Sequence, residues 1–124
     1  MEKRLGQHIL IELYDCGEEK LRDVAYIKSA MIEAAKVSNA TIVDSTFHHF
    51  SPLGVSGVVV IKESHLSIHT WPEYKYAAVD IFTCGDNINP WDAFNYLETI
   101  LEAGSVSVME ISRGKEQYLR PFAK

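Results

Sequence analysis

Apolar and polar residues alternate along several short stretches of the chain, a pattern typical of β-strands with one buried face. In the first stretch, Ile9, Ile11 and Leu13 are each separated by a single residue. The segment "GVVVI" at residues 57–61 is instead apolar on both of its faces. Together these patterns predict six strands, which cover residues 5–16, 40–50, 55–63, 65–72, 76–85 and 105–112.

Two further segments carry apolar residues at intervals of three and four, the spacing of an amphipathic helix. The first helix is expected over residues 18–39, where Asn39 is a plausible C-terminal stop. The second is expected over residues 89–104, with Pro90 near its start and Gly104 just past its end.

The resulting order, β-α-β-β-β-β-α-β, predicts a single α+β domain over residues 1–124. Consecutive strands favour antiparallel pairing, so we expect a two-layer sandwich with both helices on one face of the sheet. The opposite face would expose Val58, Val60 and their neighbours. Because large exposed apolar patches are uncommon on soluble monomers, we predict that a second copy of the chain covers this face in a homodimer.

The composition narrows the classes of protein that fit. A chain of 124 residues with 47% hydrophobic residues can bury one core, and a net charge of -5 argues against nucleic-acid binding. No apolar run is long enough to span a membrane, and the opening "MEKRLGQHIL" lacks the apolar region of a signal peptide. Cys16 and Cys84 are too few for a disulfide framework, so we expect free thiols and a cytoplasmic location.

The predicted bend between the third and fourth strands carries unexpected chemistry. Glu63, Ser64 and His65 lie there, with His69 further on, yet no Gly, Asn or Pro marks a tight turn. The simplest interpretation is that these are satisfied polar groups at strand ends. His65 and His69 could also join Cys84 in binding zinc, but neither paired cysteines nor a His-Glu-x-x-His helix supports a metal site, and none is expected.

Two other classes of site fit the sequence poorly. The "GVSGV" segment around Ser56 resembles the nucleophile elbow of serine hydrolases but lacks its spacing, and no strand-to-helix junction follows it. No Gly-rich loop leads into a helix, which argues against a phosphate-binding loop.

A reactive bend would account for the hydroxyl and the imidazoles. A serine at a strained peptide bond can attack the carbonyl before it, which converts the amide into an ester when donors stabilise the oxyanion. A base can then remove the α-proton of Ser64 and expel the acylated oxygen. The chain breaks after Glu63, and the serine becomes dehydroalanine and then a pyruvoyl group.

The residues around this bend resemble a known family, the small bacterial and archaeal S-adenosylmethionine decarboxylases, which depend on a pyruvoyl group. The likeness covers roughly residues 4–114 and is most specific in "ESHLSIHTWPE" and "DIFTCG". One departure is Lys62, where a small residue such as serine is common in the family. Lys62 adjoins the reactive bond but leaves the reacting groups intact.

The resemblance implies a role for each matching residue. Self-cleavage between Glu63 and Ser64 would give a beta chain (1–63) and an alpha chain (64–124), with Ser64 becoming the covalent pyruvoyl cofactor. His69, close in sequence to this bond, would be the proton acceptor in processing, and Ser56 would assist. Cys84 would be the proton donor in decarboxylation.

Substrate-binding residues follow from a more distant resemblance. The eukaryotic branch of the family has a "F-x-P-x-G-x-S" stretch and an "IH-x-x-PE" stretch, which match residues 50–56 and 68–73. The aromatic residue of the first stacks on adenine, which implies that role for Phe50. The last carboxylate of the second holds the ribose, which implies that role for Glu73.

The activity that the resemblance implies is decarboxylation of S-adenosylmethionine. The pyruvoyl group would form a Schiff base with the substrate and release CO2, giving the aminopropyl donor for spermidine synthesis. Two alternatives stay open: a pyruvoyl-dependent arginine decarboxylase on the same scaffold, and an unprocessed regulatory paralogue. "FSPLGVSG" and "HTWPE" favour the nucleoside substrate, and the intact processing residues argue against a paralogue.

Overall fold

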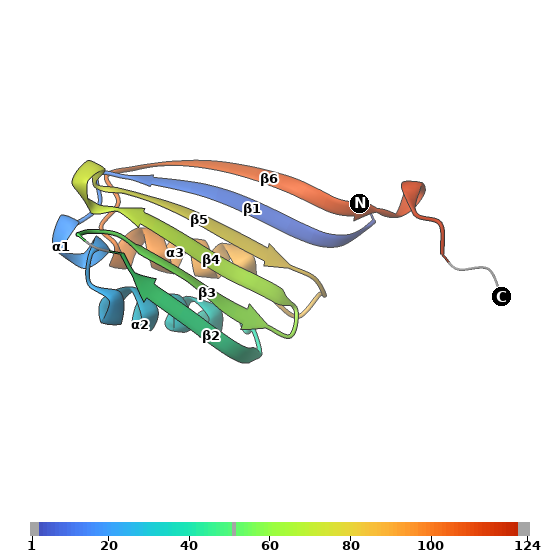
Figure 1. The fold of residues 1–124 in the computed structure, drawn as a ribbon. Coiled ribbons are helices and arrows are strands. Elements are labelled where there is room, and N and C mark those ends of the chain that lie inside the picture. The colour runs from blue at the N-terminus through green and yellow to red at the C-terminus, as the bar shows by residue number, and fades with distance from the viewer. Residues whose placement is uncertain (1–2, 51, 122–124) are drawn as a thin grey trace.

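The computed structural model describes residues 3–50 and 52–121 as one antiparallel sheet with helices against it (Figure 1). Its main elements follow the predicted order β-α-β-β-β-β-α-β. They are β1 (Arg4–Tyr14), α1 (Glu18–Leu21), α2 (Val24–Val37), β2 (Ile42–His49), β3 (Val55–Ile61), β4 (Ser64–Trp71), η1 (Pro72–Tyr74), β5 (Tyr76–Thr83), α3 (Pro90–Ile100), β6 (Ser105–Lys115) and η2 (Glu116–Tyr118).

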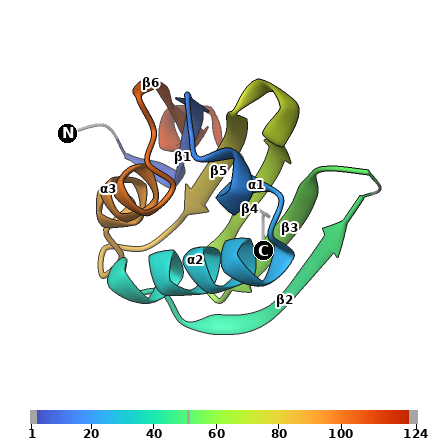
Figure 2. The same cartoon turned by 90° about the vertical axis from the view of Figure 1, so that its left-hand side faces the viewer.

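The sheet has the strand order β2-β3-β4-β5-β1-β6, and every neighbouring pair is antiparallel. Figure 2 shows α2 and α3 lying side by side against one face of this sheet. The predicted α+β sandwich with two long helices on one face is therefore confirmed. Within the described residues, neither long helix packs against the other face of the sheet, so that face is open.

One predicted helix is divided in two. The segment expected as a single helix over residues 18–39 forms α1 and α2, which are separated at Arg22 and Asp23. The Asp23 side chain caps α2 by accepting a hydrogen bond from the Tyr26 N–H at 3.1 Å. An aspartate in this position satisfies a free N–H of the first turn and so favours a new helix start over a continuous helix.

The last strand is longer than predicted. The sequence indicated a strand over residues 105–112, but β6 continues to Lys115 by pairing with β1 as far as Arg4. Figure 1 shows β1 and β6 extending together past the other strands, and η2 follows. The pairing partner, which sequence patterning does not reveal, extends the strand.

The core lies between the sheet and the helices. Alternate residues of β1, β4 and β5 point to this side, and α2 and α3 cover them. The largest fully buried side chains are Ile9, Leu13, Leu21, Ile27, Met31, Leu66, Ile68, Ile81, Leu97, Leu101, Val55 and Val59. This packing fixes which side chains of each strand face away from the helices.

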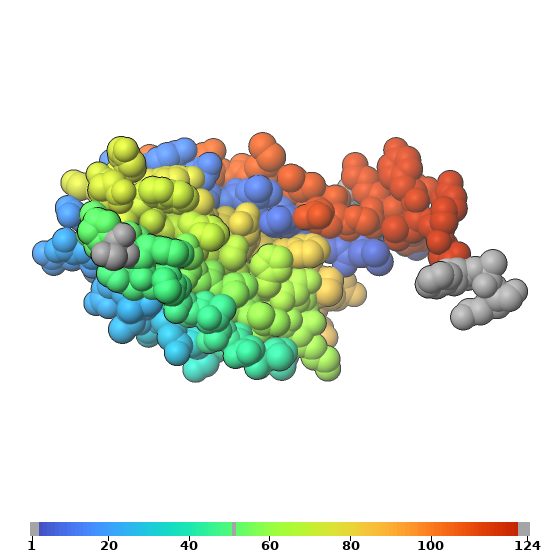
Figure 3. All heavy atoms as spheres, in the orientation of Figure 1, coloured from blue at the N-terminus to red at the C-terminus, as the bar shows by residue number. Residues whose placement is uncertain are grey.

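The face of the sheet opposite the helices, here called the helix-free face, differs from the expected apolar patch. Val60 lies on it and is 40% exposed, and Val58 is half-buried. Polar residues such as His8 and Asp80 occupy the same face on β1 and β5, so apolar and polar groups are mixed there. Figure 3 views the molecule from this side.

The described residues include no helix that is long and apolar enough to cross a membrane.

Candidate active site

The hairpin between β3 and β4 concentrates backbone strain on Ser64. Ile61 pairs with Ser64, and only Lys62 and Glu63 lie between them. Ser64 has a φ of +141°, whereas neither turn residue has a positive φ. A hairpin usually places glycine or asparagine where φ is positive, and a serine with a Cβ is strained there. The missing turn residues noted in the sequence are thus the origin of this strain.

The carbonyl oxygen of Glu63, directly before Ser64, receives two hydrogen bonds from one residue. The Cys84 N–H donates to it at 2.8 Å, and the Cys84 Sγ–H donates at 3.0 Å. The Ser64 hydroxyl lies beside them and donates to Cys84 Sγ at 3.7 Å. Two donors on one carbonyl oxygen form the arrangement that stabilises an oxyanion when a nucleophile attacks the carbonyl carbon.

The sheet register brings Cys84 to this position. Ser64 pairs with Thr83 at the end of β5. Because the strands are antiparallel, Cys84, the residue after Thr83, lies beside Glu63, the residue before Ser64. Gly85 then has a φ of +98°, where a side chain would be strained, and the chain turns away. An open pocket of about 530 Å³ lies beside Cys84, lined by residues 3–7, residues 83–86 and Glu116. A small molecule therefore has space to approach the half-buried Cys84 thiol.

Sequence patterning did not identify Thr41 as a residue of this site. It directly precedes β2, and its N–H donates to the Glu63 carboxylate at 3.1 Å. This bond is the main cause of a lowered pKa at Glu63, so the side chain is a carboxylate at neutral pH. Thr41 reaches this turn because Ile42 pairs with Ile61, and the sequence does not specify that pairing.

A second group of site residues surrounds His69. Ser56 and His69 are cross-strand neighbours on β3 and β4, and Ser56 Oγ lies 2.8 Å from His69 Nδ1. The adjacent residue Thr70 is buried and fixes this part of the hairpin. Its hydroxyl accepts a hydrogen bond from the Val55 N–H and donates one to the Leu21 carbonyl, each at 2.8 Å. The Ser56–His69 pair is exposed, but the hydrogen bonds of Thr70 hold the strands that carry it.

The two residues expected to bind the nucleoside lie at the same end of the sheet as His69. Phe50 follows β2, is 49% exposed, and has its ring 4.5 Å from that of His48. Glu73 is exposed in η1, which follows β4. The turn expected over residues 51–54 is described only in part, because Ser51 lies outside the described residues. Gly54 has a φ of +103° and accepts a hydrogen bond from the Phe50 N–H.

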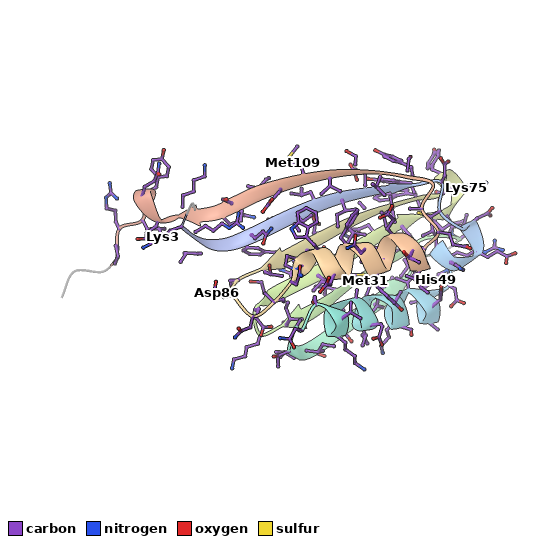
Figure 4. The ribbon with its side chains drawn as sticks, turned by 180° about the vertical axis from the view of Figure 1, so that it is seen from behind. Lys3, Met31, His49, Lys75, Asp86 and Met109 are labelled. Atoms are coloured by element: carbon purple, nitrogen blue, oxygen red, sulfur yellow. The ribbon has the colours of Figure 1, made fainter. Side chains whose placement is uncertain are left out.

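The structure separates the two groups instead of joining them. His69 lies five residues beyond Ser64 on the same strand, a separation of about 16 Å at the rise of an extended chain. In Figure 4, His49 and Lys75 mark the His69 end of the sheet, and Asp86 marks the Cys84 end. The closeness of His69 and Ser64 in sequence therefore does not bring the imidazole to the Glu63–Ser64 bond within one chain, and the processing role of His69 stays a prediction.

A polar network crosses the helix-free face near the Ser64 end. Arg113 Nη1 donates to His8 Nδ1 at 2.8 Å, and because a guanidinium only donates, the neutral imidazole carries its proton on Nε2. That nitrogen lies 3.4 Å from an Asp80 oxygen. The Phe82 ring stacks on His8, and Arg113 lies over the same ring. The sequence did not suggest this network, because its members come from three strands.

The histidines do not assemble into a metal site. Among residues 3–50 and 52–121, no group of three or more His, Cys, Asp or Glu side chains could hold a metal ion. His65 instead contacts the edge of the Phe82 ring, with centroids 5.7 Å apart.

Comparison with known proteins gives consistent results. A protein of Thermosipho melanesiensis named S-adenosylmethionine decarboxylase proenzyme is 60% identical over 113 residues, which cover 91% of this chain and 87% of that protein. A protein of the same name from Acidithiobacillus ferrooxidans is 58% identical, with coverage of 91% and 85%.

Solved structures extend the likeness to the fold. The crystal structure of the adenosylmethionine decarboxylase from Aquifex aeolicus has a TM-score of 0.86 at 36% identity and covers 98% of both chains. A Trypanosoma brucei AdoMetDC structure matches at a TM-score of 0.61 and 15% identity, over 82% of this chain and 44% of that one, which shows a shared fold alone. The sequence profile described as S-adenosylmethionine decarboxylase matches residues 7–114, so the chain belongs to the S-adenosylmethionine decarboxylase family.

Proposed function

We propose that this chain is the proenzyme of a pyruvoyl-dependent S-adenosylmethionine decarboxylase and that it cleaves itself between Glu63 and Ser64. The observation that carries the proposal is the pair of Cys84 hydrogen bonds to the Glu63 carbonyl oxygen, next to a serine with a φ of +141°. A nucleophile, a strained bond and two oxyanion donors meet at one peptide.

Self-cleavage begins when Ser64 Oγ attacks the Glu63 carbonyl carbon. The negative charge develops on the oxygen that Cys84 already binds, so the donors need no rearrangement. The C–N bond then breaks, which leaves an ester and a free amine and relieves the strain at Ser64. A base removes the Cα proton of Ser64, and the Cβ–Oγ bond breaks to release the Glu63 carboxylate. The dehydroalanine left behind tautomerises, adds water and loses ammonia, which gives the pyruvoyl group.

The base in this series of reaction steps comes from a second copy of the chain. The strand between Ser64 and His69 is rigid and about 16 Å long, so the His69 of the same chain cannot remove the proton. Two helix-free faces packed about a twofold axis that runs across the strands would reverse one β4 relative to the other. The partner's His69, held by the partner's Ser56, would then lie over the Ser64 end. This pairing defines the homodimer of two alpha and two beta chains.

In the mature site, residues at one end of the sheet carry out decarboxylation and residues at the other end bind the nucleoside. When formed, the pyruvoyl group supplies a ketone that condenses with the substrate amine and an adjacent carbonyl that accepts the electron pair left by CO2. The Cys84 thiol donates the proton that replaces CO2 on the substrate. The partner's Glu73 accepts charge-assisted hydrogen bonds from the ribose, and the partner's Phe50 stacks on adenine.

The substrate is tested by assaying decarboxylation of S-adenosylmethionine and of arginine side by side. We expect CO2 release from S-adenosylmethionine only, because the exposed Phe50 and Glu73 offer a flat ring and a carboxylate that suit a nucleoside. Release from arginine instead would identify the alternative decarboxylase. A chain that stays whole and releases CO2 from neither substrate would support the regulatory paralogue.

Cleavage itself is tested by intact mass. The wild-type chain should give one fragment that ends at Glu63 and one that begins with a pyruvoyl group. Ser64→Ala should stay whole because it lacks the nucleophile. A Ser64→Ala chain that splits at the same bond would overturn the mechanism.

The shared site is tested by mixing two variants that are each expected to remain whole. In Ser64→Ala the nucleophile is missing, and in His69→Ala the base is missing. When equal amounts are unfolded and refolded together, roughly half of the His69→Ala chains should be cleaved, the share that pairs with the other variant at random. Each variant refolded alone serves as the control. A mixture that stays uncut would show that base and nucleophile must belong to one chain.

The two cysteines provide a matched pair of variants for turnover. Cys84→Ala should lose about 10²–10⁴-fold in decarboxylation because the proton donor is gone. Its cleavage should be slower by roughly tenfold or more but should still reach completion, since the backbone N–H remains as an oxyanion donor. Cys16→Ala is the control, because burial raises the pKa of the Cys16 thiol to about 11 and the side chain lies in the core. Normal decarboxylation by Cys84→Ala would contradict this role.

A further inference from the structure

Thr41 contacts the reactive turn three times from outside the hairpin. Its N–H donates to one oxygen of the Glu63 carboxylate at 3.1 Å, and its hydroxyl donates to the other at 3.3 Å. Its carbonyl accepts a hydrogen bond from the Lys62 N–H at 2.8 Å. The turn that precedes the scissile bond is therefore bound to the start of β2, as well as to its own strands.

These contacts hold Glu63 from the strands on either side of its hairpin. The Glu63 carbonyl oxygen is bound by Cys84 at the end of β5, while the Glu63 side chain is bound by Thr41 at the start of β2. A residue in a strained backbone conformation persists only when its surroundings enforce that conformation. Lys62 and Glu63 supply no positive φ that would relieve the strain, so the strain at Ser64 depends on such outside contacts.

We propose that Thr41 is a positioning residue for self-cleavage, because its clasp on the Glu63 side chain holds the scissile carbonyl against Cys84 both before and after the chain breaks. This inference rests on the proposed function. It assigns a purpose to the carboxylate at the bend, which none of the chemical steps above requires.

The clasp survives the reaction because both of its members belong to the same product. Thr41 and Glu63 lie in the fragment of residues 1–63, whereas Cys84 lies in the fragment of residues 64–124. When the Cβ–Oγ bond breaks, Glu63 keeps its former carbonyl oxygen and takes Ser64 Oγ as the second oxygen of a new C-terminal carboxylate. The clasp keeps this charged chain end beside the Cys84 N–H and out of the space that the substrate enters.

The test compares the rate of self-cleavage after refolding, followed on denaturing gels, for the wild type and five variants. Thr41→Val deletes the hydroxyl and should slow cleavage about 3- to 10-fold, the effect of one lost hydrogen bond that is exposed to solvent. Thr41→Ser keeps the hydroxyl and should cleave at the wild-type rate. Glu63→Ala should slow cleavage further. The double variant that combines Thr41→Val with Glu63→Ala should be no slower than Glu63→Ala alone. Thr99→Val, the same change on the exposed side of α3, is the matched control.

A second measurement follows the chain end of the cleaved enzyme. Carboxypeptidase should remove Glu63 from the native Thr41→Val enzyme faster than from the wild type, as read by intact mass, with equal thermal midpoints for the two proteins. If Thr41→Val behaved like the wild type in both assays, the clasp would be overturned while the proposed function stood. The same holds if the two substitutions multiplied their effects in the double variant. A wild-type chain that never cleaves would overturn the proposed function and the clasp with it.

Discussion

The peptide between Glu63 and Ser64 is constrained on three sides, and the proposed self-cleavage depends on that constraint. Pairing of β3 with β4 fixes its two flanks, Cys84 fixes the carbonyl oxygen, and Thr41 fixes the Glu63 side chain. An unconstrained serine peptide would relax to a negative φ and lose the geometry for attack on its own carbonyl. The sheet thus concentrates strain at one peptide, and the proposed cleavage of that bond would release it.

The same sheet explains why the proposed mechanism needs two chains. A β-strand is nearly inextensible, so two residues on one strand that are five positions apart cannot converge by any small movement. Ser64, the proposed nucleophile, lies at the start of β4, and the Ser56–His69 pair lies near the other end of that strand. A flexible loop could have joined them within one molecule, but these groups stand on strands fixed by the core. In the proposed mechanism, assembly of two copies is a condition for maturation, which would delay cleavage until folding is complete.

The sequence predicted the parts of this site that depend on local chemistry. The order of elements, the bend at Glu63 and Ser64 and the strand-end position of Cys84 all follow from patterns within a few residues. It did not predict contacts that depend on register between distant strands, such as Thr41 with Glu63 or His8 with Arg113. The break at Arg22 and Asp23 was also missed, because the apolar periodicity continues across it while the cap acts through one side-chain hydrogen bond.

The helix-free face has a composition that suits a shared polar site better than a sealed apolar interface. A purely apolar face would bury well against a copy of itself but would offer nothing to orient a charged substrate. Here Val58 and Val60 lie on β3, while the network of Arg113, His8 and Asp80 crosses β6, β1 and β5. Because His8 Nε2 is buried without a hydrogen-bond partner among the described residues, burying the network between two copies would be favourable only if the second copy supplied that partner. Its position beside Phe82, two residues before Cys84, places that requirement near the proposed proton donor.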